Sequence, residues 1–367
     1  MSTENKKYRF LFAGGGTGGH LFPAVAVAER IKIKLPNAQI MFVGTKSKIE
    51  SKVIPELGYK FKSIWIKGFS RKINFENLLF PLKVIVSVIQ SIFINLNFKP
   101  QVAIGSGGYV AGPAIFASSL FGAKIILLEQ NSYPGVTSKM LEKFADEIHV
   151  GFEDSKKYFK KKEKIFFTWN PVRKNLGSIN KNDALKEFNL SDSKKTLLIV
   201  GGSLGAGSIN DAVAGSLKKL EENQIQVIWQ TGKNYYEKYR IFTSPNILVM
   251  PFIVKMDIAY SACDLMLARA GATTIAELLT LGIPSILVPS PNVTENHQYY
   301  NAKSLSEKNA AILMEDKILS SKLTDEVLSI IFNPEKLLQL KMNALLLSKP
   351  DAAEEIAARA IKYAVEV

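Results

Sequence analysis

The 367-residue sequence is poor in cysteine and histidine, with one cysteine, Cys263, and three histidines. A single cysteine excludes a disulfide framework and is typical of a reducing compartment. No set of His, Asp and Cys has metal-ligand spacing, so we expect neither a bound metal nor a resident cofactor; a Mg²⁺ carried on a nucleotide is compatible with this. The first seven residues lack the apolar segment of a secretory signal.

Acidic residues are also scarce, since 33 Asp and Glu stand against 47 Lys and Arg and leave a formal charge of +14. This excess favours an anionic partner: nucleic acid, acidic lipid or a phosphorylated substrate. Zinc-finger spacing, aromatic RNA-binding patterns and arginine-rich arms are all missing, so nucleic acid has only the charge in its favour. We therefore expect no nucleic-acid partner.

The chain is longer than one hydrophobic core usually organises, and its pattern restarts halfway. Short apolar runs alternate with helical stretches, which predicts βαβ units and parallel sheets. We expect strands at 9–13, 39–43, 60–65, 101–104, 124–128 and 147–150, and then at 196–200, 226–229, 247–250, 265–267, 285–288 and 310–314. The predicted domains are 1–168 and 169–349, with a terminal helix at 350–367 packing back on the first. Two such doubly wound domains would face a cleft and hold one ligand each.

The stretch AGGGTGGH at 13–20 joins a predicted strand to a predicted helix. Gly14, Gly16 and Gly19 satisfy the dinucleotide pattern G-x-G-x-x-G, which on its own predicts an NAD-dependent oxidoreductase. That pattern also needs an acidic residue at the end of the second strand, where this chain has Gly44 and Thr45. The nicotinamide interpretation therefore lacks its second support.

Residues 78–96 are strongly apolar, but the uncharged run after Lys83 is shorter than the roughly 20 residues that cross a bilayer. We expect no spanning helix here. Two compatible interpretations are a half-buried helix that covers a sheet and a patch that dips into lipid while its cations face anionic headgroups. The predicted membrane patch contains Lys72, Ile73, Phe75, Leu78, Leu79, Phe80 and Lys83. A non-catalytic lipid or cell-division scaffold would rest on this segment alone.

Seven motifs carry a resemblance that covers nearly the whole chain. They are GGGTGGH at 14–20, GGYVAGP at 107–113, EQN at 129–131, NPVR at 170–173, GGS at 201–203, RAGATTIAE at 269–277 and HQYYNA at 297–302. In this order they resemble the MurG family, peripheral membrane glycosyltransferases that add N-acetylglucosamine (GlcNAc) to lipid I to form lipid II. Several ordered motifs are far more specific than one glycine loop.

The resemblance implies a GT-B fold, UDP-GlcNAc as donor and undecaprenyl-pyrophosphoryl-MurNAc-pentapeptide (lipid I) as acceptor. It also implies a role in peptidoglycan synthesis, and so in cell shape and division, at the cytoplasmic face of the plasma membrane. The transfer is expected to invert the anomeric carbon in one displacement. Other enzymes with this fold, such as a glycolipid synthase or a nucleotide-sugar epimerase, remain alternatives.

The substrate-binding positions that the resemblance implies are Thr17, Gly18, Gly19, Asn131, Arg173, Ser203, Ile253, Ala272, Thr273, Thr274, Ile275, Ala276, Glu277 and Gln298. A carboxylate early in a helix, such as Glu277, can accept hydrogen bonds from both ribose hydroxyls. The start of that helix offers amides to a pyrophosphate, and Arg173 would stabilise the departing UDP. Asn131 and Gln298 are amides that can hold sugar hydroxyls, and the backbone of Ile253 can read the uracil edge.

His20 is the candidate general base because an imidazole can take up a proton near neutral pH, and Glu129 is the alternative. We expect the first glycine loop to serve the acceptor pyrophosphate and the transfer centre. Three positions depart from the family pattern. Trp169 replaces the usual glycine before NPVR, Leu204 a frequent glutamine after GGS, and Leu128 the usual histidine before EQN.

Overall fold

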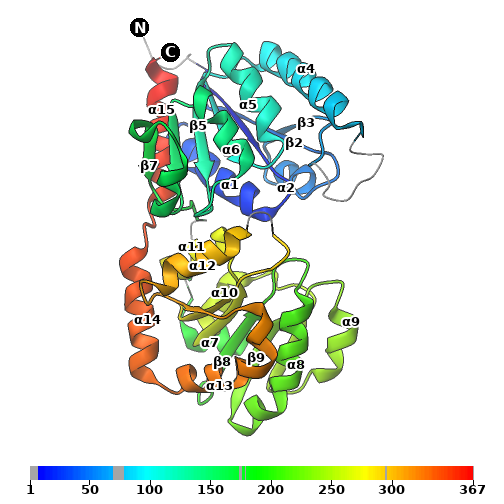
Figure 1. Cartoon of the computed structure of the whole chain (residues 1–367), viewed down its shortest axis with the longest axis vertical. Helices are drawn as coiled ribbons and strands as arrows, with labels where there is room; N and C mark the ends of the chain where they lie inside the picture. The colour runs from blue at the N-terminus through cyan, green and yellow to red at the C-terminus, as the bar shows by residue number, and fades with distance from the viewer. Residues whose placement is uncertain (1–6, 69–77, 173–175, 178, 294–295, 367) are drawn as a thin grey trace. The chain divides into compact units, whose positions relative to one another are not determined.

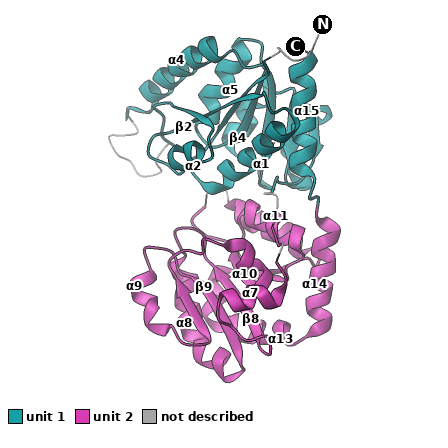
Figure 2. Ribbon diagram, turned by 180° about the vertical axis from the view of Figure 1, so that it is seen from behind, with its two compact units in different colours: residues 1–173, 349–367 teal, residues 174–348 magenta. Residues whose placement is uncertain are grey.

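The computed structural model describes residues 7–68, 78–172, 176–177, 179–293 and 296–366. The chain forms two compact units (Figure 2). Unit 1 contains Met1–Arg173 and Lys349–Val367, and unit 2 contains Lys174–Ser348. The sequence places the boundaries after residues 168 and 349, whereas the compact units divide after Arg173 and Ser348.

Unit 1 is built on a parallel sheet of seven strands in the order β3-β2-β1-β4-β5-β6-β7 (Figure 1). The strands are β1 (Arg9–Gly14), β2 (Gln39–Gly44), β3 (Lys60–Ser63), β4 (Val102–Gly107), β5 (Lys124–Glu129), β6 (Glu147–Val150) and β7 (Ile165–Phe167). The strand order reverses between β1 and β4, and open sheets bind ligands beyond the carboxyl ends of strands at such a point. The first glycine loop follows β1 and therefore lies at this point.

The helices of unit 1 pack against both faces of this sheet. They are α1 (Gly18–Lys34), α2 (Glu50–Glu56), α4 (Phe80–Phe98), α5 (Ala111–Leu120), α6 (Val136–Leu141) and α15 (Ala352–Glu366), with short 3₁₀ turns η2 (Glu142–Phe144), η3 (Glu153–Tyr158) and η4 (Lys162–Lys164). Successive residues of β1 point to opposite faces. Phe10 and Phe12 share a core with α1 and α15, whereas Leu11 and Ala13 share a second core with α5.

Unit 2 repeats the design with a parallel sheet of six strands in the order β10-β9-β8-β11-β12-β13. The strands are β8 (Lys195–Val200), β9 (Ile225–Gln230), β10 (Ile247–Met250), β11 (Leu265–Arg269), β12 (Ser285–Val288) and β13 (Ile312–Leu313). The reversal lies between β8 and β11, so the loop after β8 is again the one at the reversal.

The helices of unit 2 are α7 (Lys181–Glu187), α8 (Gly207–Glu222), α9 (Tyr236–Tyr239), α10 (Met256–Ala262), α11 (Ala272–Leu281), α12 (His297–Ser306), α13 (Leu319–Ile331) and α14 (Pro334–Leu347), with η5 (Arg240–Phe242) and η7 (Asp316–Ile318). Their apolar sides bury a core in which Trp229 is the largest side chain and is fully buried. The indole N–H of Trp229 donates to Asn210 Oδ1 at 3.0 Å, so this large ring leaves no polar group unsatisfied.

The predicted fold class of two parallel, doubly wound sheets is confirmed. Every predicted strand overlaps an observed one, but the third and the last are shorter than expected, at Lys60–Ser63 and Ile312–Leu313. Strand β7 was missed: its three residues, Ile165–Phe167, follow a run of lysines that predicted only a polar domain edge. Pairing with β6 holds β7 in the sheet despite this short length.

Candidate functional site

Two glycine motifs far apart in the sequence meet at the carboxyl ends of β1 and β4. Gly14 pairs with Gly107 across these strands. A Cβ on Gly107 would lie 2.8 Å from His20 Nδ1, and one on Gly108 would lie 2.8 Å from the Gly15 carbonyl oxygen. Both glycines also have positive φ, 95° and 76°. Both positions therefore require glycine for two reasons. A side chain would collide with the first glycine loop or with His20, and the backbone conformation is one that glycine adopts readily.

A buried carboxylate braces the first glycine loop. Glu50, at the start of α2, is 1% exposed. Its Oε2 accepts from the Gly16 N–H at 3.0 Å, and its Oε1 accepts from the N–H and the hydroxyl of Thr45, each at 3.0 Å. A Cβ on Gly15 or Gly44 would lie 2.6 or 2.4 Å from Glu50 atoms. No sequence signal marks this residue, because only the fold brings position 50 next to positions 15 and 16.

The same carboxylate affects Tyr109 of the GGYVAGP motif. Burial, followed by the negative charge of Glu50, raises the pKa of the Tyr109 phenol, although a hydrogen bond with Thr45 and the charge of Lys67 oppose the shift. A Cβ on Gly16 would lie 3.5 Å from the Tyr109 hydroxyl. Tyr109 therefore presents a protonated hydroxyl beside the loop at neutral pH.

His20 lies in the first turn of α1 with its ring orientation fixed by two acceptors. Its Nδ1 lies 2.9 Å from the Ser106 carbonyl oxygen and 3.0 Å from Gln130 Oε1. The Gln130 amide is oriented in turn, because its Nε2 donates to the Leu128 carbonyl at 3.1 Å. Two oxygen acceptors require the proton on Nδ1, which leaves the lone pair on Nε2. Gln130 belongs to the EQN motif, in which only Glu129 and Asn131 were expected to act.

Glu129, the other base candidate, is 4% exposed at the end of β5 and binds its own loop. Its Oε1 accepts from the Asn131 N–H at 3.0 Å and from Asn131 Nδ2 at 3.4 Å, and its Oε2 accepts from the Gly135 N–H at 3.0 Å. These bonds hold the loop that carries Asn131. Thr17 is the N-cap residue of α1 and is exposed, and Gly18 and Gly19 begin the helix.

In unit 2, the segment 272–277 forms the first part of α11, which begins at the end of the short loop after β11. Ala272, Thr273 and Thr274 are the first three residues of this helix, where backbone amides face outward along the axis. Ile275 and Ala276 are buried, so their side chains pack inward. Glu277 is 8% exposed, and its Oε2 accepts from the Tyr260 hydroxyl at 2.7 Å.

The second glycine loop is tied to the loop that carries Ile253 by Gln230, the last residue of β9. Gln230 Nε2 donates to the Gly202 carbonyl at 3.0 Å, and its Oε1 accepts from the Ile253 N–H at 2.8 Å. The Ile253 N–H is thus used inside the protein, and its side chain is 3% exposed. Ser203 is exposed on the loop between Gly202 and Gly205, both of which have positive φ. Gln230 had no motif signal.

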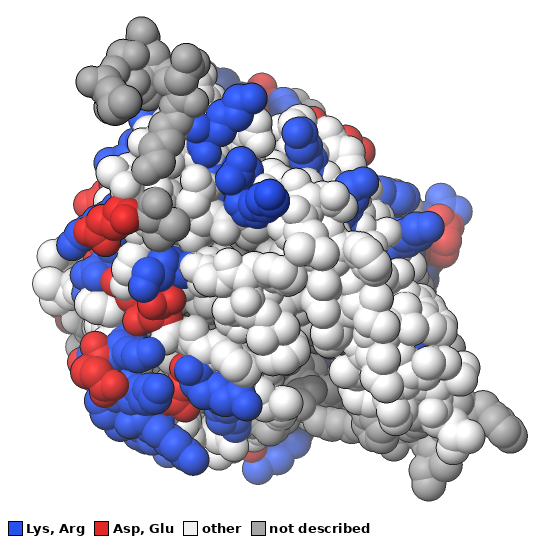
Figure 3. Space-filling view, turned by 90° about the horizontal axis from the view of Figure 1, so that it is seen from above, with Lys and Arg blue, Asp and Glu red and all other residues white. Residues whose placement is uncertain are grey.

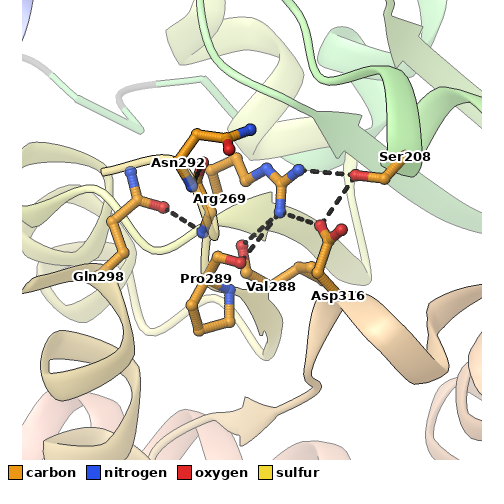
Figure 4. A network of polar contacts seen from close by, with 8 residues as sticks. Ser208, Arg269, Val288, Pro289, Asn292, Gln298 and Asp316 are labelled. Carbon is orange, nitrogen blue, oxygen red and sulfur yellow. Dashed lines mark hydrogen bonds and ion pairs between the residues drawn. The ribbon is translucent and has the colours of Figure 1, made fainter. Parts of the chain in front are cut away.

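Gln298, in the first turn of α12, accepts from the Ser290 N–H through Oε1 at 2.9 Å (Figure 4). Arg269, quoted in the sequence motif without a role, lies in the neighbouring network with Ser208 and Asp316. Arg173 lies outside the described residues. The structure thus gathers the predicted positions of unit 2 at the carboxyl edge of its sheet.

Helix α4 has an unusual distribution of side chains. Its buried side carries four polar residues, Lys83, Ser87, Ser91 and Asn95, each at most 8% exposed, beside the buried Phe98. Its exposed side carries large apolar residues: Leu79, Leu82, Ile85, Ile89, Phe93 and Leu96. The side chains of Ser87, Ser91 and Asn95 are hydrogen-bonded; the Ser118 hydroxyl, for example, donates to Asn95 Oδ1 at 2.9 Å. We call the exposed apolar residues, with Leu78, the α4 face. Figure 3 shows an uncharged area with Lys and Arg side chains around it.

Of the predicted membrane patch, Leu78 and Leu79 are 81% and 46% exposed, and Phe80 is partly exposed. Lys83 was wrongly assigned to the exposed patch: it is 8% exposed, with its ammonium 5.7 Å from the centre of the Trp65 ring. The helical period places it on the side that packs against the domain. Lys72, Ile73 and Phe75 lie outside the described residues. By length and composition α4 is apolar enough to cross a membrane, although one side packs on α5.

The departures from the family pattern have structural explanations at two positions. Trp169 has φ 63°, a left-handed conformation that glycine adopts without cost. Its ring is 6% exposed and contacts the rings of Phe152 and Phe167, with centroids 5.2 and 5.3 Å away. Leu128 is buried in the unit 1 core. Leu204 is 72% exposed, and nothing in the structure explains it.

A cavity of about 530 Å³ in unit 2 is lined by Tyr260, Cys263, Lys181 and Leu337 among others. It lies at the amino ends of β8, β11 and β12, opposite the glycine loop, so it is not the candidate site. Burial, and then the charge of Asp264, raises the pKa of the Cys263 thiol to about 12. Within the described ranges, no group of three or more His, Cys, Asp or Glu residues could hold a metal ion.

The two sheets and their loops define a class of protein, and comparison with known proteins supports it. Residues 10–150 match the glycosyltransferase family 28 N-terminal domain, and residues 196–356 match its C-terminal domain. A crystal structure of Acinetobacter baumannii MurG is similar over 97% of this chain and 99% of that chain, with a TM-score of 0.76 and 26% identity. A structure of S. aureus MnaA with UDP, 15% identical with a TM-score of 0.69, shares the fold. The chain is a GT-B glycosyltransferase.

Full-length relatives identify the family. The UDP-N-acetylglucosamine–N-acetylmuramyl-(pentapeptide) pyrophosphoryl-undecaprenol N-acetylglucosamine transferase of Bacteroides thetaiotaomicron is 44% identical over 98% of both chains. The enzyme of the same name from Flavobacterium psychrophilum is 41% identical over 97% of this chain and 98% of its own. This chain belongs to that family, the MurG family, and the resemblance stated from its motifs is confirmed.

Proposed function

We propose that this chain transfers GlcNAc from UDP-GlcNAc to the MurNAc of lipid I, producing lipid II and UDP, with the donor nucleotide held by unit 2 and the base supplied by unit 1. The acceptor hydroxyl oxygen attacks the anomeric carbon as the bond from that carbon to the pyrophosphate oxygen breaks. An α-linked donor then gives a β-linked product without a covalent enzyme intermediate. The hydroxyl proton must leave during this attack.

The observation that carries the proposal is the fixed tautomer of His20. Its Nδ1–H is held by the Ser106 carbonyl and by Gln130 Oε1, so Nε2 holds the lone pair that receives the proton. The imidazolium that forms keeps its Nδ1–H bonded to two oxygens, which stabilises the positive charge. Both oxygens of Glu129 already accept backbone N–H groups, so we assign the base role to His20 and loop bracing to Glu129.

The donor assignment follows from α11. Its first residues offer amides to the pyrophosphate, and the helix dipole favours a negative group there. Glu277 receives the ribose hydroxyls, and the bond from Tyr260 holds its carboxylate in one orientation. Ser203 and Gln298 supply polar contacts to the phosphates and the sugar, and Asn131 supplies an amide to the sugar. The backbone carbonyl of Ile253, whose N–H is already bonded to Gln230, reads the uracil edge.

Turnover with purified protein tests the function. With UDP-GlcNAc and a lipid I analogue we expect a product that carries both sugars and one UDP per product. Formation of UDP-N-acetylmannosamine without use of the acceptor would identify an epimerase instead. NADH binding with no response to UDP would identify an oxidoreductase. His20→Ala should lower kcat by a factor of about 10²–10⁴ with little change in UDP affinity, and an unchanged kcat would remove His20 as the base.

We further propose that the α4 face rests on an anionic membrane surface. A helix whose exposed side faces water usually exposes polar residues such as Ser87, Ser91 and Asn95 and buries its large apolar residues, whereas α4 does the reverse. An apolar exposed side combined with a net charge of +14 is typical of interfacial helices on acidic lipid. This surface would bring the enzyme to its lipid-linked acceptor at the cytoplasmic face of the membrane.

Vesicle flotation tests the membrane proposal. Ile89→Glu on α4 should weaken binding to phosphatidylglycerol vesicles about tenfold or more, because a charge would enter the apolar layer. Leu346→Glu is the matched control, since Leu346 is 78% exposed on α14 in unit 2. Equal binding by both variants and the unmodified protein would exclude the α4 face as the contact surface.

A further inference from the structure

Arg269, the last residue of β11, donates to four groups in three segments of unit 2 (Figure 4). Its Nη1 lies 2.5 Å from Asp316 Oδ1, 3.1 Å from the Pro289 carbonyl oxygen and 3.3 Å from that of Val288. Its Nη2 donates to the Ser208 hydroxyl at 2.8 Å. The side chains of Arg269 and Asp316 are 12% and 22% exposed. The guanidinium charge is therefore compensated inside unit 2, which makes Arg269 a poor phosphate ligand despite its place in the RAGATTIAE motif.

One of these contacts reaches a single peptide group that also holds Gln298. The Pro289 carbonyl, which accepts from Arg269, and the Ser290 N–H, which donates to Gln298 Oε1 at 2.9 Å, belong to the same peptide bond. A peptide bond is planar, and in the trans form its C=O and N–H point in opposite directions. Arg269 on one side therefore fixes the direction of the N–H on the other.

The direction of this N–H decides how Gln298 meets a ligand. Because Oε1 accepts from Ser290, the amide plane is oriented and its Nε2 donors point away from that peptide. A rotated amide would present an acceptor oxygen in place of the donors, so it could accept from a sugar hydroxyl but could no longer donate to a sugar oxygen. The orientation of this amide thus depends on a peptide that Arg269 holds.

We propose that Arg269 is a positioning residue that orients the Gln298 amide toward the donor sugar through the Pro289–Ser290 peptide. This inference rests on the proposed function, because it takes the sugar of UDP-GlcNAc to lie at Gln298. Arg269 itself does not touch the substrate. Its effect is confined to the sugar, since the nucleotide is held by Glu277 and the start of α11.

The measurement is the sugar increment, which we define as the Kd of UDP divided by the Kd of UDP-GlcNAc, both from calorimetry. Arg269→Lys keeps the positive charge beside Asp316 but lacks the planar fork that reaches both Asp316 and the carbonyls. We expect it to lower the sugar increment about tenfold, the worth of roughly one hydrogen bond, and to change the Kd of UDP less than threefold. If the Kd values of UDP and UDP-GlcNAc rise by the same factor, or if neither changes, the sugar increment is unchanged and the proposal is refuted.

A double-mutant cycle with Gln298→Ala separates positioning from general damage to the fold. If Arg269 acts through Gln298, the double variant should have a sugar increment within twofold of that of Gln298→Ala alone. A full additional loss would show that Arg269 acts elsewhere. Ser208→Ala is the matched control, because it removes the Nη2 contact and the bond from Ser208 to Asp316 but keeps the Pro289 contact. Its sugar increment should stay within twofold of that of the unmodified protein, and a larger fall would contradict the route through Pro289.

Failure of the proposed function and failure of the role of Arg269 give different results. If the unmodified protein binds neither UDP nor UDP-GlcNAc, the proposed function fails and the role of Arg269 fails with it. If the unmodified protein binds UDP-GlcNAc and makes product while Arg269→Lys keeps its full sugar increment, only the role of Arg269 is refuted.

Discussion

Glu50 offers a quantitative test of how the first glycine loop is held. Glu50→Gln keeps the side-chain volume but replaces one acceptor oxygen by an NH₂ group that faces N–H donors. The carboxylate accepts three bonds, from the Gly16 N–H and from the N–H and hydroxyl of Thr45, and it is 1% exposed. A hydrogen bond to a charged group contributes about 1.5–3 kcal/mol, and a buried donor left unpaired costs about 1–3 kcal/mol. We expect Glu50→Gln to lower the free energy of unfolding of unit 1 by about 2–4 kcal/mol.

Urea denaturation followed by intrinsic fluorescence measures this loss. With a slope of about 2–3 kcal/mol per molar urea, the midpoint should fall by about 1 M. The matched control is Glu56→Gln at the exposed end of the same helix, which should change the free energy of unfolding by less than about 0.5 kcal/mol. A Glu50→Gln protein with the midpoint of the control would refute the role of the carboxylate.

A double-mutant cycle examines the contact itself. Gly15→Ala would place a Cβ 2.6 Å from the Glu50 carboxyl group, so it should be destabilising in the natural background. In a Glu50→Ala background the same change should cost less, because the atoms it meets are gone. Strict additivity of the two changes would show that the glycine is needed for another reason.

Three further predictions concern other parts of the chain. Glu277→Gln should weaken UDP binding about tenfold or more while Ser193→Ala, on the surface, leaves it unchanged, as calorimetry will show; equal affinities would remove the ribose assignment. Trp169→Gly should relieve about 1–2 kcal/mol of left-handed strain but lose about 3–5 kcal/mol of ring burial, so the melting temperature should fall, and a rise would refute this balance. Burial raises the pKa of Glu147, but the hydrogen bond and charge of His149 and the charge of Arg359 together lower it below its ordinary value of 4.5. A lowered pKa adds stability above pH 4.5 that is lost as the pH falls through the folded-state value, so the stability advantage over Glu147→Gln should shrink below pH 4, and a constant advantage would contradict this.

Much of the fold followed from local patterns. Alternation of apolar runs with helical stretches is a short-range signal, and it placed twelve expected strands, each of which overlaps an observed one. Strand β7 was not predicted because three apolar residues beside a run of lysines are too few to show an alternation of apolar and helical stretches. Lys83 was misplaced because a charge in an apolar run suggests exposure, whereas Trp65, distant in sequence, covers it.

The site residues divide in the same way. The glycine motifs and the EQN and RAGATTIAE stretches are recognisable by their composition or by their resemblance to a family, so these site residues could be predicted from the sequence. Glu50, Gln230 and Asp316 could not, because each acts on a backbone group or side chain brought near only by the fold. No local pattern distinguishes such a residue from an ordinary surface polar side chain.

The last helix has a consequence for how the protein is made. Unit 1 includes α15, whose Ile356, Ala357, Ala360 and Ala364 complete the core formed by α1 and one face of the sheet. A ribosome therefore releases all of unit 2 before unit 1 has its final side chains, and Phe10 and Phe12 stay incompletely covered until then. Folding order should be reversed relative to synthesis: the second unit can complete its core first, and the first unit does so only once α15 has been made.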